Sequence, residues 1–388
     1  MSFTFKHKFN FYFIFLFFHT LGTTWLPYAS FLRALIFLLG FIYIIFNEKV
    51  FTRSLFLLLL LVLFLLNFIF SIDHFGSIRF FSILFPILLC EYYYSRLLNL
   101  YSRILSITNV LRVFIFISLL FYFFGDNRVI DNVFGDDGFD FGNQFSGVFE
   151  SVNYFYFYFF IFISSNIILY KLSKFYSLIN IVLIILTSAI LVLKFPTINR
   201  TFILASIFFF IMIFDNKLFK SFIYLSLLCL IFVLSTNFEF EYLESYGLKT
   251  KDFVEYGFFG NRTEIWTGVI NIVKSNSYYL YGAGYGNEVH TLNSLKLLDF
   301  QNLHAHNTYL SILLEFGLIP TFFILIYMFC IIFRNLSRNK ILISLFGSFF
   351  IFSLFDSVFK SGFNPGHFLF FSLFIFQDYR HKLFSKND

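Results

Sequence analysis

The sequence predicts an all-α integral membrane protein with about twelve transmembrane helices. Of the 388 residues, 59% are hydrophobic and 13% are charged, whereas soluble domains have about 45–50% apolar and about 25% charged residues. The mean hydropathy is +0.80. A soluble protein has no way to hide this much apolar surface from water, and a disordered chain would need far more charge. The 70 phenylalanines are apolar enough to serve as lipid-facing filler in place of leucine or valine, and their excess is interpreted as compositional drift of the source genome.

The apolar runs are continuous rather than alternating, which favours helices over a β-barrel. A helix needs about 20 residues to cross the hydrocarbon core of a bilayer. The first run follows Lys6 and Lys8 without a convincing small-residue cleavage site, so we expect an uncleaved span. The predicted spans are residues 9–24, 31–46, 53–70, 74–90, 105–124, 148–170, 175–193, 200–214, 219–236, 307–333, 341–359 and 367–378.

The basic residues predict the orientation of these spans, because loops rich in lysine and arginine stay in the cytoplasm. Most of them lie in alternate loops, whereas the other side is rich in acidic residues. Both termini are therefore expected in the cytoplasm. The basic residues of the cytoplasmic side are Lys6, Lys8, Lys49, Arg53, Arg96, Arg103, Lys171, Lys174, Lys217, Lys220, Arg334, Arg338, Lys340, Arg380, Lys382 and Lys386. Because they are scattered singly, they form no patch for nucleic acid.

Two hydrophilic segments lie on the predicted outer side. Residues 125–147 contain five aspartates among glycines and are expected to be a solvated loop. Residues 237–305, just before the tenth span, form the one large loop, and loops of this length are uncommon unless they are functional. We therefore expect three parts: spans one to nine in 1–236, the periplasmic loop in 237–305, and spans ten to twelve in 306–388.

Two arginines begin predicted helices on the outer side. Arg200 follows Pro196 at the start of the eighth span, and Arg262 precedes Thr263, the expected N-cap of a short amphipathic helix. The apolar stripe expected on this helix is Ile265, Trp266, Val269, Ile270 and Val273. An arginine opposes the dipole at a helix N-terminus but can complete an anion site there. In both cases the alternative is an arginine that reaches a lipid phosphate.

Glycines and histidines follow along the chain. The segment Gly282-Ala283-Gly284-Tyr285-Gly286 lacks the context of a dinucleotide fold, so we expect a tight turn packed against other backbone. His304 and His306 precede a helix that should begin near Asn307. Gly317 and Pro320 should break it, so that a separate short helix precedes a span starting near residue 318.

No metal site is predicted. The two histidines are two residues apart, which is no helical ligand pair, and no third ligand lies at zinc spacing. The three cysteines form no cluster. An interfacial histidine bonded to a loop carbonyl is the alternative interpretation of His306.

In this order, the motifs resemble those of the O-antigen polymerase and ligase superfamily. The resemblance covers residues 145–320 in motifs and the whole chain in topology. The matching segments are Phe145-Ser146-Gly147-Val148-Phe149, Arg200-Thr201, Asn261-Arg262-x-x-Ile265-Trp266, Gly282-x-Gly284-x-Gly286, His306-Asn307-x-Tyr309-Leu310 and Glu315-x-Gly317-Leu318-Ile319. The chain departs from the family pattern at Asn199, where a serine is usual, and at Pro320, where a glycine is common.

The resemblance implies an inverting, metal-independent glycosyltransferase, without a cofactor, on the outer face of a bacterial inner membrane. Donor and acceptor would be glycans on undecaprenyl pyrophosphate, and membrane lipid, a chain-length regulator and a flippase would be further partners. Arg200 and Arg262 would stabilise the pyrophosphate leaving group, and His306 would orient or deprotonate the acceptor hydroxyl. Further substrate-binding candidates are His304, Asn307, Tyr309, Glu315 and Gly284.

Three activities stay open at this point. A polymerase is favoured, and a ligase that transfers finished glycan to lipid A–core shares the same motifs. A non-catalytic transporter or flippase would carry charges near the bilayer midplane. Against transport, Arg33 and Arg112 are expected near the inner ends of their spans, and Asp356 near an outer end.

Overall fold

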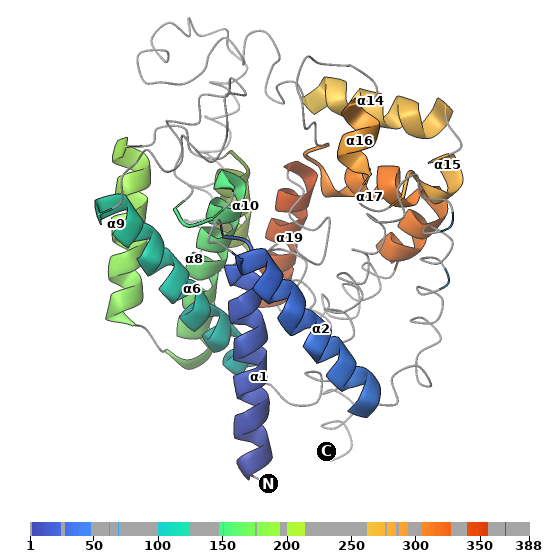
Figure 1. Ribbon diagram of the computed structural model, residues 1–388. Helices are drawn as coiled ribbons and strands as arrows, with labels where there is room; N and C mark the ends of the chain where they lie inside the picture. Colours follow the sequence, from blue (N-terminus) through green and yellow to red (C-terminus); the bar gives the residue numbers. More distant parts are fainter. Residues whose placement is uncertain are drawn as a thin grey trace, which may run out of the picture.

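The computed structural model describes residues 2–24, 28–47, 62, 69, 100–124, 147–149, 151–174, 177–194, 200–213, 262–275, 278–284, 287–293, 305–326, 340–355 and 369. These residues are almost entirely helical and include no β-strand (Figure 1). An isolated antiparallel bridge joins Thr24 to Phe149. The predicted all-α class is confirmed for this part of the chain.

Helices occupy most of the predicted spans that fall within the described residues. They are α1 (Ser2–Leu21), α2 (Ala29–Asn47), α6 (Leu100–Phe124), α8 (Val152–Ser173), α9 (Leu178–Lys194), α10 (Arg200–Ile213), α14 (Arg262–Ser275), α15 (Tyr278–Tyr281), α16 (Glu288–Asn293), α17 (Thr308–Phe316) and α19 (Lys340–Phe355). Residues 318–326 are also helical. Apart from single positions, the predicted spans 53–70, 74–90, 219–236 and 367–378 lie outside the described residues.

Among the residues that the structure describes, two helices are long and apolar enough to cross a membrane by length and composition, namely Leu100–Phe124 and Asn153–Ser173. They correspond to the fifth and sixth predicted spans. The total of twelve spans remains a prediction, as does the acidic loop 125–147, which lies outside the described residues except at Gly147.

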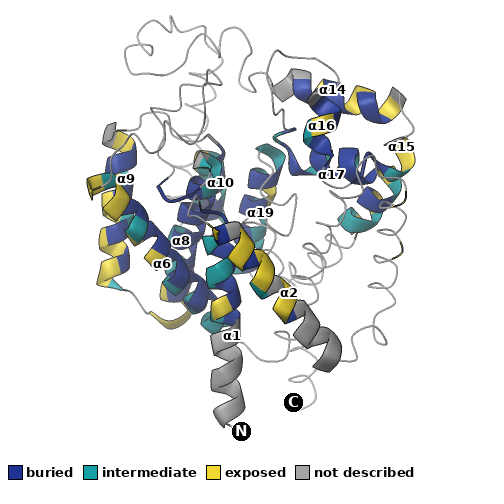
Figure 2. Ribbon diagram, in the orientation of Figure 1, coloured by how far each residue is buried: buried dark blue, intermediate teal, exposed yellow. Residues whose placement is uncertain are grey.

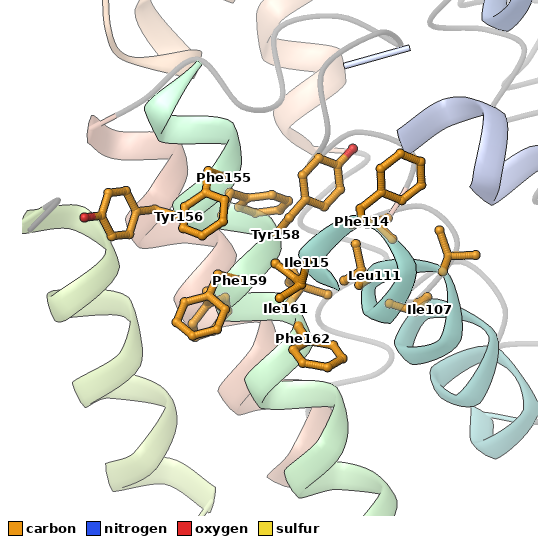
Figure 3. Packing of buried hydrophobic residues seen from close by; sticks show 14 of the residues in the cluster. Ile107, Leu111, Phe114, Ile115, Phe155, Tyr156, Tyr158, Phe159, Ile161 and Phe162 are labelled. Atoms are coloured by element: carbon orange, nitrogen blue, oxygen red, sulfur yellow. The ribbon is translucent and has the colours of Figure 1, made fainter. Parts of the chain in front are cut away.

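Aromatic side chains build the core between α6 and α8. Phe155, Phe157, Phe159, Phe160 and Phe162 are almost completely buried, and Figure 3 shows part of this packing against Ile107, Leu111, Phe114 and Ile115 of α6. The Phe157 ring also lies 5.4 Å from that of Phe349 and 5.1 Å from that of Phe352, both on α19. In α8, phenylalanine therefore fills the interior, which corrects its interpretation as lipid-facing filler for this helix.

The buried positions of α9 include polar residues, and many of its exposed positions are apolar. On α9, Asn180 and Thr187 are buried, whereas Leu178, Ile185 and Val192 are more than half exposed (Figure 2). Arg112 Nε donates to Asn180 Oδ1 at 2.6 Å, and Asn180 Nδ2 donates to Asn166 Oδ1 at 2.6 Å. This distribution is typical of helices that face lipid, where packing does not need an apolar interior and hydrogen bonds join the helices.

The two bundle arginines correct an expectation from the sequence. Because α6 begins at Leu100, Arg112 lies at its midpoint rather than near an end. Arg33 packs on Gly22, where an added Cβ would lie 2.5 Å from the arginine Cδ. Gly22 belongs to the connection between α1 and α2, which the predicted orientation places on the outer side, so the expected inner position of Arg33 does not agree with that orientation. Asp356 lies outside the described residues.

Candidate functional site

Helices α14 to α17 form a small group beside the upper end of α19 in Figure 1, with a core of their own. Its buried members are Ile265, Val269, Ile272, Val273, Leu292, Ala305 and Leu314. The apolar stripe of α14 thus includes Ile272, whereas Ile270 is 39% exposed. At 3.6 residues per turn, positions 265, 269, 272 and 273 share one face, and position 270 does not. The helix begins at Arg262, so Thr263 is its second residue and not its N-cap as expected.

The glycine segment makes the tight turn that the sequence predicts, and it packs on the end of α17. The Ala283 N–H donates to the Leu314 carbonyl at 2.8 Å, and the Gly284 N–H donates to the Glu315 carbonyl at 3.0 Å. These bonds satisfy carbonyls that a helix C-terminus leaves without an intrahelical partner. Tyr285 and Gly286 lie outside the described residues.

Two glycines allow this close approach. Gly282 has a φ of 78° and Gly317 a φ of 72°, both in the left-handed region. A Cβ on Gly282 would lie 2.3 Å from the Glu315 carbonyl oxygen, and one on Gly317 would lie 2.4 Å from the Gly282 nitrogen. Only glycine fits at these two positions.

The start and the end of α17 confirm the predicted short helix. Asn307 is the N-cap, and its Oδ1 accepts from Tyr309 N at 2.9 Å and from Leu310 N at 3.1 Å. Gly317 ends the helix, and the chain is helical again from Leu318. This second helix begins where the sequence predicts it, and Pro320 fits in its first turn, where a missing N–H costs no intrahelical hydrogen bond.

His306 adopts an unusual backbone conformation immediately before this cap. Its φ is 47°, in the left-handed region that non-glycine residues avoid. The residue is partly exposed, whereas Ala305 and Asn307 on either side are buried. Strained backbone of this kind persists only where the surrounding structure fixes it, and it is concentrated at functional sites.

The surrounding structure fixes Ala305 from two sides. Glu288 Oε1 accepts from the Ala305 N–H at 2.7 Å, and Trp266 Nε1 donates to the Ala305 carbonyl at 2.8 Å. The same Glu288 oxygen accepts from Ser311 Oγ at 2.7 Å, and Glu288 is fully buried. The sequence analysis missed Glu288, because an acidic residue in the first turn of α16 has an ordinary explanation in the helix dipole.

Trp266 also connects the helix face that carries Arg262 to the segment before His306. Residues four apart lie on the same face of a helix, so position 262 shares a face of α14 with Trp266. Trp266 in turn bonds the residue before His306. The side chain of Arg262 lies outside the described residues, as do Asn261 and His304.

Helix α10, which begins at Arg200, packs on α19. Ser348 Oγ donates to the Ala205 carbonyl at 3.0 Å, and the Phe208 ring packs on Gly347, so the two helices run in opposite directions. Five residues before Ala205 is Arg200, and five residues after Ser348 is Ser353. At about 1.5 Å per residue, the start of α10 is therefore level with Ser353. The side chain of Arg200 lies outside the described residues.

Tyr309 joins α17 to this end of α19. Its hydroxyl forms a hydrogen bond with the Ser353 side chain, and its ring lies 5.6 Å from that of Phe350. Burial raises the pKa of the Tyr309 phenol to about 12, although the bond with Ser353 lowers it. Glu315 is fully buried at the end of the helix. The substrate-binding roles of Tyr309, Glu315, Asn307 and Gly284 stay predictions.

Within the described residues, no group of three or more histidine, cysteine, aspartate or glutamate side chains is placed to hold a metal ion. The chemical groups that the structure brings to this region are the His306 imidazole and the buried Glu288 carboxylate. Position 262 begins α14, which contacts α17, whereas position 200 begins α10, which packs on α19.

Comparison with known proteins adds no relative. No family model matches the chain, and no curated protein matches it significantly. The resemblance to the O-antigen polymerase and ligase superfamily therefore depends on the motifs themselves.

Proposed function

We propose that this protein is a membrane glycosyltransferase that joins oligosaccharide repeat units, carried on undecaprenyl pyrophosphate, into a surface polysaccharide. The reaction would take place on the outer face of a bacterial inner membrane. The observation that carries the proposal is the left-handed conformation of His306, held between the Ala305 contacts and the Asn307 cap. Trp266 lies one turn after Arg262 on α14 and bonds the residue before His306, so the arginine that would receive the anionic leaving group belongs to a helix that contacts this segment.

His306 has the role of general base in this proposal. The acceptor hydroxyl oxygen attacks the anomeric carbon of the donor, and its proton passes to the His306 imidazole. The glycosidic C–O bond to the pyrophosphate breaks, and the electron pair leaves with undecaprenyl pyrophosphate. A single displacement of this kind inverts the configuration at the anomeric carbon.

Arg200 and Arg262 stabilise the leaving group. Guanidinium groups bind phosphate oxygens in a bidentate manner, which suits the charge that develops on pyrophosphate as the bond breaks. Both arginines begin helices, where N–H groups and the helix dipole add to the positive potential.

Purified protein, supplied with lipid-linked repeat units and without added nucleotide or metal, tests the proposal. We expect chain growth with the wild type and none with Arg200→Ala, Arg262→Ala or His306→Ala. His290→Ala and Lys274→Ala are matched controls, because both residues are exposed in the same helix group and should leave growth unchanged. Full-length polymer from the three site variants would refute the proposal, and no growth with wild type would favour transport.

A deletion strain separates polymerase from ligase. Loss of a polymerase leaves lipopolysaccharide with a single repeat unit. Loss of a ligase leaves the core without O-chain and accumulates lipid-linked glycan. The transport alternative has one observation in its favour, the Arg112 contact with Asn180 at the middle of α6, since charges inside a membrane often mark a transport path.

A further inference from the structure

The strained backbone at His306 needs an external restraint. A non-glycine residue leaves the left-handed region unless its neighbours are fixed in place. On the C-terminal side, Asn307 is fixed by its two bonds to the first N–H groups of α17. On the N-terminal side the restraint has to come from other helices, because Ala305 has no polar side chain.

Glu288 and Trp266 supply that restraint from α16 and α14. The Glu288 carboxylate accepts a hydrogen bond from the Ala305 N–H, and the Trp266 indole N–H donates one to the Ala305 carbonyl. Both backbone polar groups of Ala305 are therefore held in place. The Ser311 hydroxyl bonds the same carboxylate oxygen and thereby ties Glu288 to α17, the helix that Asn307 caps.

We propose that Glu288 is the positioning residue of His306: its hydrogen bond to Ala305 sets the backbone conformation in which the imidazole faces the hydroxyl group of the acceptor glycan. Glu288 touches no substrate in this proposal and acts only through the backbone of residue 305. The kinetic part of the proposal depends on the proposed glycosyltransferase activity, whereas the positioning itself does not.

Turnover and substrate affinity separate positioning from a general loss of structure. Glu288→Ala removes the oxygen that accepts the hydrogen bond from the Ala305 N–H. We expect kcat to fall about 100-fold with KM little changed, because a small displacement of a reacting group lowers the rate by about this factor. Glu288→Gln keeps an acceptor oxygen and should recover most of kcat. Trp266→Phe keeps an aromatic ring and removes the N–H, so its kcat should lie between wild type and Glu288→Ala. Ile270→Ala, exposed on the same helix as Trp266, is the control.

Chemical modification tests the positioning without any glycan. Diethyl pyrocarbonate reacts with neutral imidazole, and mass spectrometry gives the rate for each histidine of the full-length protein. With Glu288→Ala, we expect faster modification at His306 and a shifted midpoint of its pH profile. His290, exposed on α16, is the internal reference and should not change.

The outcomes are distinguishable. Unchanged modification at His306 in Glu288→Ala overturns the proposal, as does an equal change at His290. A kcat of Glu288→Gln as low as that of Glu288→Ala overturns it as well. If wild-type protein elongates no glycan while His306 alone responds to Glu288→Ala, the proposed function fails and the positioning role stands.

Discussion

Gly282→Ala should detach the glycine turn from the end of α17. The added Cβ would lie 2.3 Å from the Glu315 oxygen, 2.4 Å from the Glu315 carbon and 2.5 Å from the Gly317 nitrogen. All three are backbone atoms, so no side chain can move aside. The alanine would also have to adopt a φ of 78°, which costs about 1–2 kcal/mol.

Separating the two segments breaks the hydrogen bonds from Ala283 to Leu314 and from Gly284 to Glu315. Each contributes about 0.5–1.5 kcal/mol. Together with the backbone strain, the expected loss of local stability is about 2–5 kcal/mol. At about 1.4 kcal/mol per factor of ten, amide exchange in α17 should accelerate at least about 25-fold.

Hydrogen exchange followed by mass spectrometry, on the full-length protein in detergent, measures this change in peptides that cover residues 308–316. Ile185→Ala is the control, because this side chain is 61% exposed on α9, outside the group of α14 to α17. If the amides of α17 exchange at the wild-type rate in the Gly282→Ala variant, the close approach of the two glycines is not what holds the end of the helix.

Three further predictions concern single side chains. His306→Gly relieves the left-handed backbone strain that His306→Ala retains. The amides of α17 should therefore exchange about fivefold more slowly in the glycine variant than in the alanine variant, which corresponds to a gain of about 1 kcal/mol. Both variants should make no polymer, and equal exchange rates in the two would contradict the strain. Tyr309→Phe should leave the pH dependence of chain growth unchanged, because a phenol with a pKa of about 12 stays protonated near neutral pH. A pH dependence that differs between Tyr309→Phe and wild type would contradict this and assign the difference to the phenol. Asn180→Leu breaks the chain of hydrogen bonds from Arg112 through Asn180 to Asn166. It should lower the midpoint of thermal unfolding in detergent, at a cost of about 0.6–1.7 kcal/mol for each interhelical bond. An unchanged midpoint would mean that these bonds contribute nothing to the packing of α6, α8 and α9.

The sequence predicts best where local chemistry decides the structure. Asn307 and Gly317 mark the limits of α17 because a cap and a left-handed glycine act within a few residues. Thr263 fails as a predicted cap, although threonine suits that position, because the helix already includes Arg262. Local preference alone does not tell a first turn from the residue that precedes it.

Glu288 shows what the sequence could not predict. It bonds a backbone N–H 17 residues away, and that N–H belongs to an alanine. Any residue other than proline offers the same donor, so the pair leaves no pattern in the sequence.

The phenylalanines of α8 give a second example of this limit. Lipid and protein interior are equally apolar, and hydropathy does not separate the side chains that face one from those that face the other. Buried polar residues such as Asn180 and Ser165 mark the inward faces instead.

Helix α19 has a consequence for the tolerance of the chain to insertions and deletions. Ser348 contacts α10 and Ser353 contacts α17. The five-residue interval between them therefore fixes the angle around the α19 axis between these two contacts. Removing one residue from this interval would turn Ser353 by about 100° and shift it by about 1.5 Å. Insertions or deletions of one residue within this turn and a half should therefore be more damaging than the same changes at the Lys340 end of the helix, which leave Ser348 and Ser353 in the same mutual orientation.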